Sequence, residues 1–199
     1  MSENAIPFYH IIMKCRGYTK REVVLPDGYS IVPYTEGREK DWARLEVAIG
    51  DFDTSEAAER RFCGSYLGGV LPYENILFLL SPSGKAIGSC IAEVKEQDGK
   101  ITAALQWLVV DRNHRGNGLG RALAVAVMNI FAKKGIDTVY LHTQPHSYKA
   151  ILLYHSLGFR LQKTDSFSGK PNEYQNAIEV LKDLYRVEDY RALTDSADE

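Results

Sequence analysis

Residues 105–121 read LQWLVVDRNHRGNGLGR, an apolar run that leads directly into three closely spaced glycines. The run favours a strand ending near Val110, and the apolar positions that follow Gly118 recur at helical spacing. A strand therefore enters a glycine turn, and the turn opens a long helix. The first N–H groups of a helix have no intrahelical acceptors, and the helix dipole adds positive charge there. The stretch predicts a site for a phosphate or pyrophosphate, flanked by Arg115 and Arg121.

The glycine spacing excludes two common phosphate-binding motifs. A Walker loop ends in GK[ST], whereas Gly120 is followed by Arg121 and Ala122. The dinucleotide fingerprint has the spacing G-x-G-x-x-G after the first strand of a parallel unit. This chain has G-x-G-x-G, and the preceding strand belongs to a predicted antiparallel meander. A different phosphate-bearing ligand is expected.

The chain around this turn predicts an α+β fold with a mixed, mostly antiparallel central sheet flanked by helices. Turn residues Gln97, Asp98 and Gly99 join two of the strands as a hairpin, and an acidic tail at 195–199 is expected to fray. The periodicity places strands at 29–35, 76–80, 87–95, 101–110, 138–142 and 159–162, and helices at 38–49, 55–67, 118–134, 148–157 and 174–185.

The composition argues against several classes of protein, among them nucleic-acid-binding, membrane and disulfide-rich proteins. The 199 residues suit one domain, and 24 basic against 26 acidic residues argue against a protein built mainly to bind nucleic acid or an anionic membrane. Three widely spaced cysteines suggest neither a disulfide framework nor a metal site. No apolar run spans a membrane, and residues 1–7 lack the features of a signal peptide. We therefore expect a cytoplasmic protein, either a monomer or a homodimer.

A second motif lies about thirty residues after the turn, where residues 147–159 read SYKAILLYHSLGF. With both motifs the chain resembles the GNAT superfamily of acyl-CoA-dependent N-acyltransferases. The signature [RQ]-x-x-G-x-[GA] is matched by Arg115, Gly118 and Gly120. The signature N-x-x-A-x-x-L-Y-x-x-x-G-F is matched except at Ser147, where the family usually has Asn; its matching residues are Ala150, Leu153, Tyr154, Gly158 and Phe159.

The resemblance covers about residues 29–162 of a single expected domain, 1–199. It leaves an N-terminal extension at 1–28 and an extra C-terminal helix at about 173–186. It implies a GNAT-like fold and transfer of an acetyl group from acetyl-CoA to a primary amine by direct attack on the thioester. The acceptor is then a small molecule or a protein. A non-catalytic acyl-CoA sensor of the same fold is the alternative.

The resemblance also implies roles for individual residues. The pantetheine arm is expected along Leu108, Val109 and Val110, and Tyr154 is expected to protonate the departing thiolate, although a tyrosine on an amphipathic helix also suits a core. Ser147 is expected to cap its helix and, with Tyr154, to touch the cofactor. The pyrophosphate is expected on the glycine turn, at Arg115, Gly116, Asn117, Gly118, Leu119, Gly120 and Arg121.

The general base and the acceptor site are less defined by the sequence. If alternation holds, Ala104, Gln106 and Leu108 share one strand face and offer no carboxylate, so the candidate bases are Glu93 and His142. The candidate residues for binding the acceptor are Asp51 and Phe52, at the junction of the first two helices, and Gln106 on the strand at 101–110. Asp53 is expected to cap the second helix, with Glu56 completing a capping box.

Overall fold

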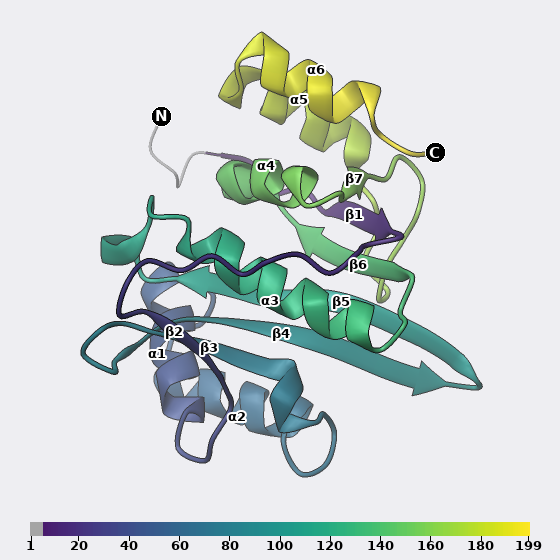
Figure 1. The fold of residues 1–199 in the computed structure, drawn as a ribbon. Helices are drawn as coiled ribbons and strands as arrows, with labels where there is room; N and C mark the ends of the chain where they lie inside the picture. The colour runs from purple at the N-terminus through teal and green to yellow at the C-terminus, as the bar shows by residue number, and fades with distance from the viewer. Residues whose placement is uncertain (1–5) are drawn as a thin grey trace. The chain divides into compact units, whose positions relative to one another are not determined.

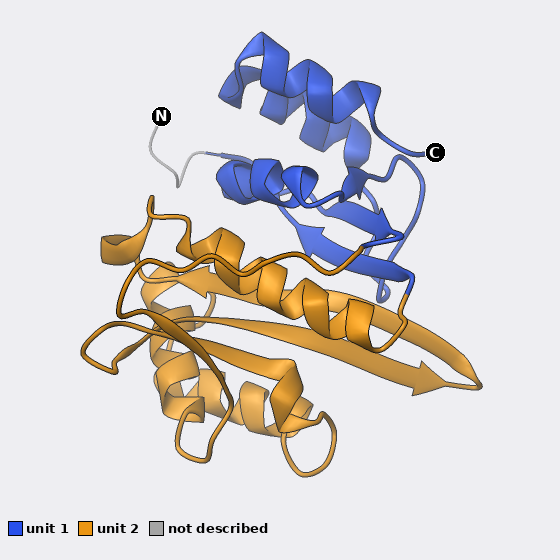
Figure 2. Ribbon diagram, in the orientation of Figure 1, with its two compact units in different colours: residues 1–18, 137–199 blue, residues 19–136 orange. Residues whose placement is uncertain are grey.

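The computed structural model describes residues 6–199, whose contacts form two compact units (Figure 2). The larger unit is Thr19–Ile136, and the other runs up to Tyr18 and resumes at Asp137. The single domain with a core at 29–162 stays a prediction. Residues 1–5 of the expected extension lie outside the described residues.

The larger unit contains an antiparallel sheet in the order β2 (Ser30–Pro33), β3 (Ile76–Leu80), β4 (Ala86–Gln97) and β5 (Lys100–Val110). The predicted hairpin is confirmed, because β4 and β5 pair through a tight turn in which Asp98 and Gly99 have φ of 52° and 73°. Positive φ at both central residues gives the twist that a two-residue hairpin needs. The fold class predicted from the sequence is confirmed.

Two helices cover one face of this sheet and a third covers the other (Figure 1). On the first face, α1 (Glu39–Ile49) and α2 (Ser55–Tyr66) enclose an aromatic core that includes Trp42, Phe62 and Phe78. On the second face, α3 (Leu119–Lys133) presents a nearly continuous apolar surface, consistent with its burial over β4 and β5. Short 3₁₀ turns lie at Tyr73–Asn75 and Arg112–His114.

The start of α2 differs from the prediction. The N-cap is Thr54, whose hydroxyl oxygen accepts the N–H of Ala57 at 3.2 Å, so Asp53 is not the cap. A threonine one position further on satisfies the same orphan donors. Asp53 is an exposed loop residue.

The other unit is built on a strand that the sequence analysis did not predict. β1 (Ile11–Arg16) is the central strand, pairing antiparallel with β6 (Thr138–Thr143) and with β7 (Arg160–Leu161). The helices of this unit are α4 (Tyr148–Ser156), α5 (Tyr174–Leu184) and α6 (Val187–Asp195), with a 3₁₀ turn at Pro145–Ser147 before α4.

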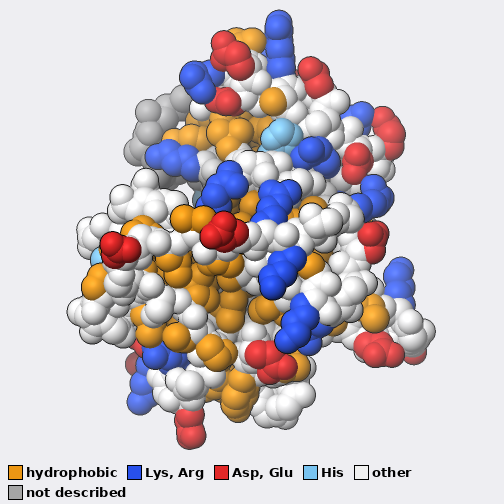
Figure 3. Space-filling view, viewed as in Figure 1, with side chains coloured by type: hydrophobic (Ala, Val, Ile, Leu, Met, Phe, Trp, Pro, Cys, Tyr) orange, Lys and Arg blue, Asp and Glu red, His pale blue; other side chains and the backbone are white. Residues whose placement is uncertain are grey.

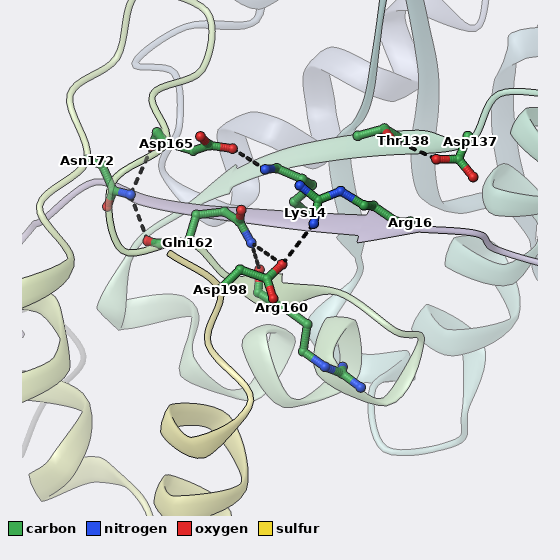
Figure 4. Close-up of polar contacts among 9 residues, drawn as sticks. All are labelled: Lys14, Arg16, Asp137, Thr138, Arg160, Gln162, Asp165, Asn172 and Asp198. Atoms are coloured by element: carbon green, nitrogen blue, oxygen red, sulfur yellow. Dashed lines mark hydrogen bonds and ion pairs between the residues drawn. The ribbon is translucent and has the colours of Figure 1, made fainter.

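The acidic tail is held in place, so the expectation that it frays is wrong. The backbone of Asp198 makes two hydrogen bonds: its N–H donates to the carbonyl of Leu161 at 2.8 Å, and its carbonyl accepts the N–H of Lys163 at 2.9 Å. Its carboxylate accepts hydrogen bonds from Gln162 at 3.2 Å and from Arg16 at 3.4 Å (Figure 4). Within residues 6–199, no helix combines the length and apolarity that crossing a membrane requires.

Candidate functional site

The glycine turn has the geometry of an anion site. Gly118 is the N-cap of α3 with φ of 76°, and the first helical hydrogen bond runs from the Ala122 N–H to the Gly118 carbonyl at 3.0 Å. The N–H groups of Gly118, Leu119 and Gly120 therefore lack intrahelical acceptors. A Cβ added at Gly118 would meet no atom within 4 Å, so a ligand can approach its backbone. These features fit a phosphate group.

The other glycines and arginines of the turn have distinct roles. Gly116 also has a positive φ of 88°, whereas Gly120 does not. Both Arg115 and Arg121 are exposed, as expected for residues that flank an anion. Arg115 also braces the turn, because its Nε donates to the carbonyl of Val110 at 2.9 Å.

A groove of about 440 Å³ adjoins the turn, lined by the turn, by α3 and by residues 21–26. In Figure 1 the segment after β1 crosses in front of α3. Asn129 anchors it, since its side-chain amide accepts the Arg21 N–H at 2.9 Å and donates to the Arg21 carbonyl at 2.8 Å. Figure 3 shows hydrophobic side chains at the surface of this area, in agreement with the lining residues Val24, Leu25 and Val125. The groove offers apolar surface beside an anion site.

β5 contains a bulge just before the turn. Opposite β4, Ser89 pairs with Val109 but Ile91 pairs with Gln106, so β5 has one residue more than β4 in this interval. Trp107 lies in the bulge with φ of 53°, a conformation that a bulky residue rarely adopts. The expectation that Gln106 and Leu108 alternate onto one face is therefore wrong at the bulge.

The bulge directs Trp107 toward α1 and α2. Its Nε1 donates to the Tyr66 hydroxyl at 2.6 Å, and its ring centroid lies 5.2 Å from Trp42 and 5.9 Å from Phe52. Gln106 lies directly opposite Ile91, which belongs to the α1–α2 core, so Gln106 faces the same side. The structure thus brings Phe52 and Gln106 to one face of the sheet.

The other residues of the larger unit that the sequence predicted for the site differ in how exposed they are. Asp51 is exposed and immediately follows the Gly50 cap of α1. Leu108 is half-buried, and Val109 and Val110 are buried near the end of β5. Glu93 is 9% exposed, and its carboxylate pairs with the exposed Lys95 ammonium at 3.0 Å. Glu93 lies two residues from Ile91 and so faces α1 and α2 as well.

Sequence reasoning missed Glu46. This residue of α1 is 1% exposed, and no residue in 6–199 hydrogen bonds to its Oε1. Burial, with a smaller contribution from Asp51, raises the pKa of the Glu46 carboxyl to about 9. A signal was present, because Glu46 follows Trp42 by four positions and so shares the core-facing side of an amphipathic helix.

In the smaller unit, His142 lies in a pair of imidazoles. Its Nε2 is 2.7 Å from Nδ1 of His10, whose backbone N–H donates to the Glu173 carboxylate at 2.8 Å. Burial, with smaller contributions from Lys170 and His10, lowers the pKa of His142 to about 4. His142 is therefore neutral at pH 7 and a weak proton acceptor. No group of three potential metal ligands occurs among residues 6–199.

Tyr154 lies on α4 and is 7% exposed, with its ring edge-on to Phe159 at a centroid distance of 6.0 Å. Ser147 occupies the N-cap position of α4, but its side chain makes no capping hydrogen bond, so that expectation is wrong. The helix instead continues from the 3₁₀ turn at Pro145–Ser147. The Ser147 side chain is not committed to the cap.

Comparison with known proteins identifies the family. The sequence model of the Acetyltransferase (GNAT) family matches residues 35–159. The chain belongs to the GNAT family. The matched region contains the bulge, the glycine turn and Tyr154, whereas β1, α5 and α6 lie outside it.

Individual GNAT relatives match part of their own length. The mycothiol acetyltransferase of Thermobispora bispora is 36% identical over 146 residues, which is 68% of this chain and 48% of that protein. The chain spans about half the length of the curated mycothiol acetyltransferases that it matches over most of its own sequence.

Two solved structures show the same fold. A GNAT from Sphaerobacter thermophilus aligns with a TM-score of 0.61 and 22% identity, covering 78% of this chain and 49% of its own. Arabidopsis thaliana Naa50, in complex with the bisubstrate analogue CoA-Ac-MVNAL, aligns with a TM-score of 0.55 and 17% identity. That alignment covers 66% of this chain and 82% of Naa50.

Proposed function

We propose that this GNAT protein transfers an acetyl group from acetyl-CoA to a primary amine. The observation that carries the proposal is the glycine turn at the start of α3, with unpaired helical N–H groups at Gly118 and Leu119 and a groove beside them. The family match and the CoA conjugate bound by Naa50 support the same ligand. Within residues 6–199 the three cysteines form no disulfide, which fits a reducing compartment, and we place the protein in the cytoplasm.

Acetyl-CoA supplies an activated acetyl group as a thioester. In the proposed reaction the turn N–H groups hold the pyrophosphate, and Arg121 and Arg115 add positive charge beside it. Backbone groups of 108–110, directly after the bulge, bind the pantetheine arm and polarise the thioester carbonyl. Tyr154 donates a proton to the thiolate as it leaves. The bulge contributes by interrupting the regular strand where these backbone groups are needed.

The acceptor is an amine, either on a small molecule or on a protein. Both kinds occur among proteins of similar sequence or fold, since the relative in Thermobispora bispora is named for mycothiol and Naa50 binds a peptide conjugate. In this chain the acceptor side is the face of the larger unit that carries Phe52, Gln106 and Trp107. Its aromatic surface and acidic neighbours suit an amine attached to an apolar group.

Asp51→Asn tests the acidic side of this proposal. Because Asp51 is exposed beside Phe52, removal of its charge is expected to raise KM for cationic amines two- to fivefold. The effect should shrink in high salt, since exposed charges are screened over about 10 Å at 0.1 M. Steady-state kinetics with Asp53→Asn as the matched control measures this, because Asp53 is also an exposed loop carboxylate. An unchanged KM at low ionic strength would make Asp51 a solvated loop residue.

The proposed activity is tested by release of free thiol from acetyl-CoA in the presence of a panel of primary amines. Amine-dependent release is expected. A chain that binds acetyl-CoA but releases no thiol with any amine would instead be an acyl-CoA sensor of GNAT fold.

A further inference from the structure

Two buried polar groups without hydrogen-bond partners among residues 6–199 face the region between α1 and the sheet. Glu46 is 1% exposed, and its Oε1 has no hydrogen-bond partner among residues 6–199. Ser89 on β4 is fully buried, and within the same described residues its hydroxyl oxygen also lacks a partner. Ser89 lies two residues from Ile91 and therefore faces α1 and α2. Buried polar groups without partners are rare in folded proteins and call for an explanation.

Both groups lie on elements that touch the bulge, since Ser89 pairs with Val109 on β5 and Glu46 shares α1 with Trp42. Trp42, one helical turn before Glu46 on the same face of α1, contacts the ring of Trp107 at a centroid distance of 5.2 Å. Trp107 is the strained residue of the bulge, which lies directly before the strand segment proposed to bind the thioester arm. Glu46 thus lies on the face where the amine is proposed to attack. Glu93 shares this face, but its carboxylate pairs with Lys95, whereas no residue in 6–199 hydrogen bonds to Oε1 of Glu46.

We propose that the Glu46 carboxylate accepts the proton that the attacking amine loses, through a water molecule bound to its otherwise unpartnered oxygen. The assignment rests on the proposed acetyl transfer. It names a general base for that reaction, for which the sequence offered two candidates, Glu93 and His142. A bridging water is required because the carboxyl is almost fully buried, and one water is a normal link between a base and its substrate. Buried waters bind polar groups that the chain leaves unsatisfied.

In the proposed reaction, each proton that the amine loses has an acceptor, and one bond forms as one bond breaks. The ammonium form of the acceptor gives one proton through the water to Glu46, which becomes neutral. The amine nitrogen then forms a bond to the acetyl carbon as the carbon–sulfur bond breaks, and the sulfur leaves with the electron pair. Tyr154 protonates that thiolate. As the amide forms, the nitrogen loses a second proton, which restores the Tyr154 hydroxyl, and its last proton stays on the amide; Glu46 then releases its proton to solvent.

The charges around Glu46 favour this role. Asp51 raises the pKa of Glu46, and the elements packed against α1 contribute Tyr66, Cys90 and Glu93; their cations Arg61 and Lys95 act on Tyr66 and pair with Glu93, respectively. Desolvation raises the pKa of the carboxyl to about 9. An alkylamine has a pKa near 10, so proton transfer between the two groups is nearly balanced. The ionised fraction of Glu46 rises with pH up to about 9, so kcat/KM is expected to rise over the same range.

The test compares Glu46→Gln with Glu93→Gln on two acceptors at pH 8. One acceptor is a primary alkylamine from the panel, and the other is its β,β,β-trifluorinated analogue, whose amine is neutral at pH 8 because three electron-withdrawing fluorines lower its pKa well below 8. With the alkylamine, Glu46→Gln is expected to lower kcat/KM about 10²-fold, the usual contribution of one general base. With the fluorinated amine the loss should be less than about fivefold, because no proton has to be removed before attack. Glu93→Gln should leave the ratio of the two amines unchanged.

Several results would overturn the assignment. Equal losses on both amines would show that Glu46 only supports the fold, and no loss on either amine would show that another group accepts the proton. In either case the wild type still turns over and the proposed activity stands. A wild type inactive on both amines would overturn the proposed activity and the assignment together.

A readout independent of activity checks the protonation of Glu46. A group with a raised pKa in the folded state stabilises the fold fully below its unfolded pKa and loses that contribution as pH rises toward 9. The melting temperature of Glu46→Gln relative to wild type is therefore expected to increase from pH 5 to pH 9. A difference that does not change over this range would mean that Glu46 is ionised throughout and is not the poised base proposed.

Discussion

Tyr154→Phe is expected to lower kcat by about 10²-fold or more, the size of one general acid contribution, and to leave acetyl-CoA affinity nearly unchanged. The substitution keeps the ring, which is 7% exposed and packs edge-on against Phe159, and deletes only the hydroxyl. One hydrogen bond of the hydroxyl is worth about 0.5–1.5 kcal/mol net, so binding and stability change little. Thiol release across pH, with circular dichroism to confirm folding, measures the effect.

Tyr148→Phe is the matched control for this prediction, because Tyr148 lies on the same helix α4 and its ring is half-buried against Tyr185. It should keep kcat close to that of the wild type. If folded Tyr154→Phe retains more than about a third of the wild-type kcat, the tyrosine is a core residue and the thiolate takes its proton from elsewhere.

Gly118→Leu is expected to abolish the thermal stabilisation that CoA gives to the wild-type chain. At 100 times its dissociation constant, CoA should add about 2.7 kcal/mol, which is roughly 5–10 °C for a domain of this size. Gly118 has φ of 76° and open space around its Cβ position, so a side chain there enters the volume that the phosphate would occupy. Melting curves with and without CoA measure the loss.

The strain of the substitution itself needs a control, since a non-glycine residue in the left-handed region costs about 1–2 kcal/mol. Gly84 has φ of 79° and, like Gly118, nothing within 4 Å of its Cβ position, but it lies in the turn between β3 and β4. Gly84→Leu should lower the melting temperature to a similar extent and keep the full CoA shift. Loss of the shift in both variants would assign the effect to general destabilisation.

Much of the fold was predictable because its signals are local. The hairpin at Asp98 and Gly99 is specified by two adjacent residues that tolerate positive φ. The helix that begins after Gly118 combines apolar periodicity with a glycine start, and the observed bounds differ from the predicted ones by a single residue at each end. The anion site follows from the same stretch, because helix N-termini bind anions wherever they occur.

The features that escaped prediction depend on contacts between distant residues. β1 is buried along most of its length, so its sequence shows no alternation of polar and apolar residues. The bulge at Trp107 is set by pairing with β4 and by the Tyr66 hydrogen bond, neither of which leaves a local mark. Glu46 was missed because a carboxylate is normally solvated, although its place four residues after Trp42 puts it on the core-facing side of α1. Asp198 likewise gains its partners from β7 and β1.

The central claim, acetyl transfer to an amine, is tested most directly by mass spectrometry of the acceptor after incubation with acetyl-CoA and the chain. The account predicts an N-acetylated amine in amounts equal to the thiol released, with product lost in Tyr154→Phe and retained in Tyr148→Phe. A chain that is thermally stabilised by CoA but leaves every amine unmodified and acetyl-CoA intact would contradict it.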